Sequence, residues 1–133
     1  MKLVVVLDSE LPLGLVANTA AYMGFSMGQF LENSLAQDAI DAEGRVHLGT
    51  SPIPIPILKA EKGKLKEIFD KANSIETITM MDFTDVAQVS RVYSDYIERI
   101  RNVAVEDLNY LGLALYGPKK QVNSLTGSLP LLR

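Results

Sequence analysis

The chain of 133 residues contains no cysteine. Disulfide bonds, thiolate metal ligands and a cysteine nucleophile are therefore excluded. Histidine is almost as scarce, because His47 is the single one. It has no cluster of acidic residues near it, so we expect neither a metal site nor any other cofactor. We interpret His47 as a strand residue whose ring meets a structural partner or solvent.

Long apolar runs are also missing. The opening stretch, MKLVVVLDSE, has one lysine, a short apolar run and then two acids. It is too short to span a membrane and lacks a signal-peptide cleavage pattern. We interpret it as a buried strand of a cytoplasmic protein that has no membrane partner.

Positive charge is in short supply as well. The formal net charge is −3 and the calculated pI is about 5.1. Lysines gather only at 59–66 and at Lys119 and Lys120. Domains that grip polyphosphate chains usually carry a basic excess on one face, so we expect no nucleic-acid partner. Such short lysine runs favour a solvated surface or a helix start.

What is present is an ordinary globular balance, with 47% hydrophobic and 22% charged residues. Apolar strand patterns alternate with amphipathic helical patterns and no linker interrupts them, which predicts one α/β domain over residues 1–133. We expect a three-layer α/β/α fold on a mixed, mainly parallel sheet of about four strands. The predicted strands cover parts of Leu3–Leu7, Ile55–Lys59, Thr77–Met81 and Leu111–Tyr116.

Helical spacing predicts the remaining elements. The predicted helices run from Pro12 to about Gln37, over 62–73, and over 85–101 with a cap at Thr84 or Asp85, and a short helix or turn follows at 118–127. The third helix is expected to bury a stripe that consists of Val86, Val89, Val92, Tyr93, Tyr96, Ile97 and Ile100. Residues 41–49 predict a turn, with Gly44 at positive φ, and a short strand. Pro52, Pro54 and Pro56 predict an edge strand that becomes regular at ILKA, or else polyproline helix.

The first helix opens with LPLGLVANTAAYMG, which is rich in the smallest residues. Either a ligand or another backbone must come close to it. One hypothesis is that 14–22 forms a wall of a cleft, in which the helix N-terminus and Asn18 receive an anionic or carbonyl group. The other is that Ala17, Ala20, Gly24 and Gly28 seat the helix on the sheet or on a second copy in a homodimer.

Several segments resemble a known family. They are LPLGLVANTAAYMG, DAEGRVH, PIPIPILKA, DFT and YLGLALYGPKKQVNSLTGSLPLLR. The start and the end of the chain resemble type II peptidyl-tRNA hydrolases. Nearly the whole chain is similar to the family called domain of unknown function 2000, which is grouped with those hydrolases. The resemblance implies their α/β fold.

The hydrolase motif is not retained. Those enzymes carry a K-G-K-x-A-x-Q-x-x-x-H-like motif, whose glycine matches Gly14. Its lysines then fall on Leu13 and Leu15, its glutamine near Thr19 and its histidine near Tyr22. Leucine supplies no charge for an oxyanion, so the resemblance does not imply peptidyl-tRNA hydrolysis.

The candidate ligand-binding residues follow from these patterns. They are Asn18, Thr19, Tyr22, Asp8, Asp82 and Lys119. Asp8 and Asp82 end strands, where open α/β sheets bind ligands, although either side chain could equally cap a helix. Lys119, Lys120 and Thr126 follow the last strand, a region that lies near the site in the resembling hydrolases; exposed lysines are the alternative.

Three functions remain open at this point. The first is a domain that binds a small molecule or a peptide end, or that regulates a partner. The second is an amide or ester hydrolase of altered mechanism that uses Asp82, Thr19 and Tyr22. The third is a non-catalytic dimeric structural module.

Overall fold

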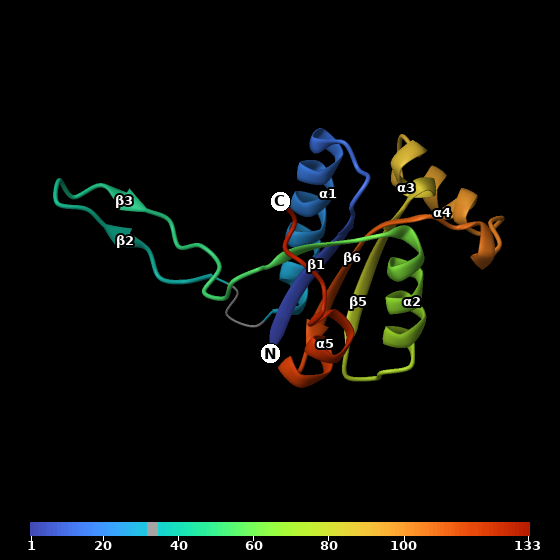
Figure 1. Cartoon of the computed structure of the whole chain (residues 1–133). Coiled ribbons are helices and arrows are strands. Elements are labelled where there is room, and N and C mark those ends of the chain that lie inside the picture. The colour runs from blue at the N-terminus through green and yellow to red at the C-terminus, as the bar shows by residue number, and fades with distance from the viewer. Residues whose placement is uncertain (32–34) are drawn as a thin grey trace.

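The computed structural model describes residues 1–31 and 35–133. Its centre is a four-stranded sheet in the order β4-β1-β6-β5 (Figure 1). The strands are β1 (Lys2–Asp8), β4 (Ile57–Ala60), β5 (Thr79–Thr84) and β6 (Tyr110–Gly117). All four predicted strand segments are therefore confirmed.

The expectation of a mainly parallel sheet is wrong. Only β1 and β4 pair in parallel, whereas β6 is antiparallel to both of its neighbours, β1 and β5. Strands β1, β4 and β5 run in one direction, but the last strand, β6, inserts between β1 and β5 in the opposite direction. One central reversed strand makes two of the three pairs antiparallel.

Helix α1 (Leu13–Met27) covers one face of the sheet (Figure 1). Its buried residues Met23 and Met27 pack with Leu3, Val5 and Leu7 of β1. The helix ends ten residues before the predicted end at Gln37, because a 3₁₀ turn over Gly28–Phe30 leads into extended backbone at Leu31. Part of the predicted extension, residues 32–34, lies outside the described residues.

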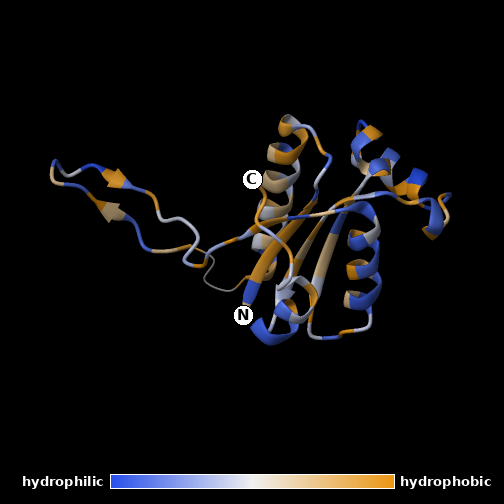
Figure 2. Cartoon of the chain, viewed as in Figure 1, coloured by the Kyte–Doolittle hydropathy of each residue, from blue (hydrophilic) through white to orange (hydrophobic). Residues whose placement is uncertain are grey.

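Helices α2 (Lys62–Asn73) and α5 (Lys119–Thr126) cover the opposite face (Figure 1). Their apolar side chains form a second core cluster with the other face of β1 and β6. It contains Val4, Val6, Leu65, Ile68, Leu113, Leu115, Val122 and Leu125, among others. The sheet therefore carries helices on both faces, and Figure 2 shows its strands as largely hydrophobic ribbon.

The predicted third helix is broken in two. The chain forms α3 (Asp85–Val89) and α4 (Tyr93–Ile100), separated by extended backbone at Ser90. Thr84 caps α3 as predicted, since its hydroxyl accepts a hydrogen bond from the amide of Ala87. The predicted buried stripe is wrong. Its members Val89, Val92, Tyr93 and Ile97 are exposed, because no layer formed by residues 1–31 or 35–133 packs over the pair beyond the edge strand β5.

Two short strands, β2 (Ala39–Ile40) and β3 (Val46–His47), form a separate hairpin. Gly44 sits in its turn with φ of 81°, as predicted. We call residues 36–50 the arm. Figure 1 shows that the arm projects away from the rest of the chain.

The proline-rich segment leads into an edge strand, as predicted. Strand β4 begins at Ile57, directly after the third proline, and lies at one edge of the sheet. The chain end covers part of its outer side, because the amide of Lys59 donates to the carbonyl of Pro130 and the amide of Leu132 donates to that of Ile57.

Candidate functional site

A cleft of about 380 Å³ lies at the exposed edge of β5, between the C-terminal half of α1 and the α3–α4 pair. Most of its lining residues carry an aromatic ring, a hydroxyl or another polar group. They are Tyr22, Met23, Ser26, Gln29, Met81, Asp82, Phe83, Ala87, Ser90, Arg91, Val92, Tyr93 and Tyr96. Ligand pockets commonly have volumes of about 300–1,000 Å³, so the cleft suits a small organic molecule.

Helix α1 contributes one wall. Tyr22 and Ser26 are one turn apart, and the hydroxyl of Ser26 donates to the carbonyl of Tyr22 at 2.8 Å. The Tyr22 ring tilts toward Phe83 of β5, with the ring centroids 6.0 Å apart. This aromatic pair closes the side of the cleft next to the sheet.

The break between α3 and α4 builds the opposite wall. The hydroxyl of Ser90 donates to the carbonyl of Val86 at 2.7 Å, which ties the end of α3 to the turn that follows. Chain reversal there places the first turn of α4 beside the cleft. The rings of Tyr93 and Tyr96 lie 5.5 Å apart in a tilted arrangement.

Asp82 is the acidic residue in the cleft, and it lies on β5 between Met81 and Phe83. Its side chain is half-buried, and this burial raises the pKa of its carboxyl above the usual value of 3.8. A hydrogen bond from its own backbone amide offsets part of that increase in pKa. Within residues 1–31 and 35–133, no lysine, arginine or histidine forms an ion pair with it.

The negative charge of Asp82 also affects the pKa of Tyr96. Burial is the main cause that raises the pKa of Tyr96, and the charges of Asp82 and Tyr93 add to it. At neutral pH the tyrosine therefore keeps its proton and can donate a hydrogen bond. The cleft offers an uncompensated carboxylate, hydroxyl groups and aromatic faces, a combination that suits a ligand with both a positive charge and an apolar body.

The structure brings together some of the sequence-predicted residues. Tyr22 and Asp82 line the same cleft, although they come from different elements. Asn18 lines a shallow groove that adjoins it on the outer side of α1, together with Ala21, Tyr22, Phe25 and Ser26. Tyr22 and Ser26 border both hollows.

The remaining candidates lie elsewhere. Thr19 is 1% exposed and packs against the sheet. Asp8 is also buried, and its carboxylate accepts a hydrogen bond from the amide of Glu10 in the turn after β1. Lys119 and Lys120 begin α5 beyond the far end of β6, and the Thr126 hydroxyl donates to the carbonyl of Val122. Buried Thr19 cannot act with Asp82 on a substrate in the cleft.

Both hollows border the C-terminal half of α1 rather than its start. Leu13 and Gly14 in the first turn of α1 are exposed. Its N-cap residue, Pro12, makes no side-chain capping bond. The candidate site therefore lies near Tyr22 and Ser26, and not at the helix start near Gly14.

Sequence reasoning missed the wall formed by Ser90, Arg91, Tyr93 and Tyr96. The two tyrosines were assigned to a buried helical stripe because they have helical spacing. The sequence carries no clear signal for the break, because Ser90 and Arg91 fall on the polar face of the predicted helix.

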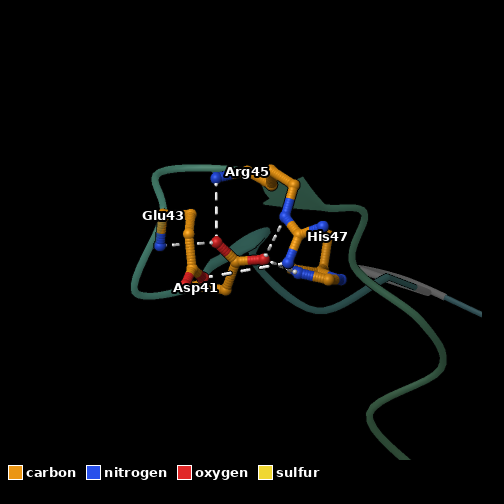
Figure 3. A network of polar contacts seen from close by, with 4 residues as sticks. All are labelled: Asp41, Glu43, Arg45 and His47. Atoms are coloured by element: carbon orange, nitrogen blue, oxygen red, sulfur yellow. Dashed lines mark hydrogen bonds and ion pairs between the residues drawn. The ribbon is translucent and has the colours of Figure 1, made fainter.

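His47 has a structural partner, as predicted. In the arm, its Nε2 lies 2.9 Å from the Asp41 carboxylate, which also contacts Arg45 Nε at 2.9 Å (Figure 3). Across residues 1–31 and 35–133, no three histidine, aspartate or glutamate side chains gather in a way that could hold a metal ion. In the same part of the chain, no helix is long and apolar enough to cross a bilayer.

Two comparisons place the chain among known proteins. The family described as Protein of unknown function (DUF2000) matches residues 1–133. A solved structure, that of protein of unknown function Atu0240 from Agrobacterium tumefaciens strain C58, matches with a TM-score of 0.86 and 18% identity, over 98% of this chain and 96% of that one. At this identity the likeness establishes a shared fold alone. No curated protein matches the sequence significantly.

Proposed function

The chain belongs to the DUF2000 family, and we propose that it is a small-ligand-binding domain whose ligand carries a positively charged amine on an aromatic or apolar body. A free amino acid derivative or the amino end of a peptide has this chemistry. The cleft at the edge of β5 receives it, and Asp82 accepts the hydrogen bonds of the amine.

The observation that carries this proposal is the environment of Asp82. A carboxylate that loses water without gaining a positive partner raises the energy of the folded chain. Ligand amines relieve that cost, because a charge-assisted hydrogen bond replaces the lost water. A site that keeps such a carboxylate half-buried among aromatic rings therefore favours cations.

The rings of the cleft supply the second part of recognition. Tyr22 and Phe83 stand on one side, and Tyr93 and Tyr96 on the other. Aromatic faces attract ammonium groups by about 0.5–2 kcal/mol, depending on how dry the site is. They also bury the apolar body of the ligand. Arg91 at the rim is available to an anionic group of a zwitterionic ligand.

We further propose that the domain has the fold of type II peptidyl-tRNA hydrolases without their reaction. Leu13 and Leu15 stand where that motif has lysines, and neither can stabilise an oxyanion. The net charge of −3 also disfavours binding to tRNA. Ligand binding, rather than hydrolysis, is the function that the cleft supports.

Calorimetric titration tests the proposal with two probes that differ in one group. We expect 2-phenylethylamine to bind the purified protein with a dissociation constant in the millimolar range or tighter, and 3-phenylpropionate, an anion of similar size, not to bind. Asp82→Asn removes the charge at constant volume and should weaken amine binding at least tenfold. Asp70→Asn, on the exposed side of α2, is the matched control and should bind as the wild type does.

The result that contradicts the proposal is equal binding of both probes, or amine binding that Asp82→Asn leaves unchanged. Native mass spectrometry of the protein purified from cells then identifies the natural ligand. An anionic ligand in that spectrum would also overturn the role given to Asp82.

A further inference from the structure

The outer face of α1 is uncharged and largely apolar, and its side chains are exposed in the part of the chain that the structure describes. We define it as Leu13, Ala17, Asn18, Ala21, Tyr22 and Phe25, all of which are exposed. Phe25 is 90% and Leu13 is 83% exposed. No acidic or basic residue occurs between Leu11 and Leu31. A solvated helix normally turns charged residues outward, so this face has the composition of a covered one.

The glycines of α1 support the same conclusion. A Cβ added at Gly14 or Gly24 of α1, or at Gly28 in the 3₁₀ turn that follows, would meet no described atom within 4 Å apart from its chain neighbours and the backbone of its own helix. Packing among the described residues therefore does not require these glycines, although each glycine inside a helix costs about 1 kcal/mol relative to alanine. Of the residues expected to seat α1 on its own sheet, Ala20 packs against the core there, whereas Gly24 and Gly28 contact nothing across the interface among the described residues. Close approach of another molecule accounts for them.

The arm is the second unpartnered apolar surface. Ile40, Val46 and Leu48 are exposed, at 71%, 59% and 78%. Strands β2 and β3 pair with each other in a sheet of their own, and Figure 1 shows the hairpin extending away from the rest of the chain. A lone two-stranded hairpin is marginally stable in water, so a projecting arm with apolar side chains gains stability from a surface to lie on.

We propose that this surface is a second copy of the chain: the arm of each protomer lies against the outer face of α1 of the other. The arm projects away from the body, so it cannot cover its own α1 (Figure 1). In a twofold dimer the exchange occurs twice, and each copy both gives and receives an arm.

The charges of the arm fit this occupant. The Asp41 carboxylate is paired inside the arm with Arg45 and His47 (Figure 3). An internally paired charge does not require a counter-charge from the receiving surface, and the outer face of α1 has none to offer. A basic or acidic partner protein would find no complementary charge on α1.

The area is also sufficient. The exposed parts of Leu13, Tyr22 and Phe25, together with those of the three arm residues, amount to roughly 800 Å² per protomer, taking about 180 Å² as the mean full area of an aromatic or large aliphatic residue. A standard specific interface buries about 800 Å² on each partner. Covering these two surfaces alone therefore reaches the size of a stable dimer.

Sedimentation velocity at tens of micromolar protein tests the association. We expect the wild type to sediment as a dimer and Phe25→Glu as a monomer with unchanged far-UV circular dichroism, because the Phe25 side chain is 90% exposed. Val105→Glu changes another exposed apolar residue outside both surfaces and should remain a dimer. A monomeric wild type, or a Phe25→Glu variant that stays dimeric, overturns the proposal.

Disulfide trapping tests the arrangement. Because the natural chain has no cysteine, only the introduced cysteines can form a cross-link. Ala21→Cys and Val46→Cys are prepared separately, mixed and oxidised. Arm exchange predicts a cross-linked dimer in the mixture that contains one copy of each variant. Cross-linking of Ala21→Cys to itself, in the absence of the arm variant, would instead indicate two α1 helices face to face and would overturn the exchange.

Discussion

Thr19 of α1 packs directly over Gly112 of β6. A Cβ added at Gly112 would lie 3.2 Å from Cγ2 of Thr19, 2.8 Å from Cδ2 of Leu7 and 3.3 Å from the sulfur of Met23. The close approach of α1 to the sheet therefore depends on a glycine in the strand. The glycines of the helix make no such contact among the described residues.

We expect Gly112→Ala to lower the free energy of unfolding by about 1–3 kcal/mol, the usual cost of one extra methyl group in a filled core. Urea denaturation followed by circular dichroism measures the loss. Gly63→Ala is the matched control, since its Cβ meets nothing within 4 Å in α2. If Gly112→Ala is as stable as the control, α1 does not pack closely against β6 at Gly112.

The local elements were predictable from the sequence because apolar patterns report burial of each segment. Strand order was not, since the pattern of β6 is the same whether it lies at an edge or between β1 and β5. The prediction that the stripe from Val86 to Ile100 is buried was wrong for a related reason. Helical spacing identifies an apolar face, but it does not indicate whether another layer covers that face.

The site was predictable only in part. Asp8 and Asp82 look equivalent in the sequence, because each follows an apolar run, but the expectation that Asp82 ends its strand is wrong: β5 continues to Thr84. They differ because Asp8 ends a central strand and binds the backbone of the following turn, whereas Asp82 lies on the edge strand β5, where a cleft can form. Tyr93 and Tyr96 were missed because the helix break at Ser90 was not recognised.

Tyr110 and Phe69 allow a stability test of a buried hydroxyl. Their rings stack with centroids 4.5 Å apart, and the Tyr110 hydroxyl is buried without a hydrogen-bond partner among the described residues. We expect Tyr110→Phe to be neutral or to stabilise the fold by up to about 1 kcal/mol, because an unpaired buried hydroxyl costs free energy. Phe69→Ala should instead cost about 2–3 kcal/mol. Chemical denaturation distinguishes the two, and a clear loss of stability in Tyr110→Phe would contradict the absence of a partner.

Asp82 should reduce stability where it is ionised. Its pKa is raised in the folded chain, so the folded state binds a proton more tightly than the unfolded state does, and stability falls as the pH rises above the usual value of 3.8. Asp82→Asn should therefore raise the melting temperature at pH 7 by a few degrees, since 1 kcal/mol corresponds to about 3–5 °C in a domain of this size.

The pH dependence separates this effect from a simple packing change. Below the usual aspartate pKa the Asp82 carboxyl of the wild type is protonated, so it is uncharged like the asparagine of the variant. The higher melting temperature of Asp82→Asn should therefore disappear there. Calorimetric scans at pH 7 and near pH 3.5 make the comparison, with Asp70→Asn as the control. A gain that is equal at both pH values would rule out the electrostatic explanation.

Asp41 should hold the turn of the arm in a pH-dependent way. Its carboxylate accepts hydrogen bonds from the amides of Glu43 and Arg45, each at 3.0 Å. The hydrogen bond with His47 is the largest cause that lowers the pKa of this carboxyl, and the bond from the Arg45 amide is the next. A lowered pKa means that the turn is stabilised above the usual value of 3.8 and loses this support as the pH falls through the lowered value.

We expect the amide resonances of Gly44 and Arg45 to keep their folded chemical shifts down to pH 4 and to move toward unfolded positions at lower pH. In Asp41→Ala they should have unfolded positions at every pH, because the acceptor of both turn amides is gone. Glu43→Gln, a neighbouring change of one charge, is the control and should behave as the wild type does. Two-dimensional NMR of the labelled protein follows all three. Folded turn shifts in Asp41→Ala, or a midpoint above 3.8 in the wild type, would show that Asp41 does not organise the arm.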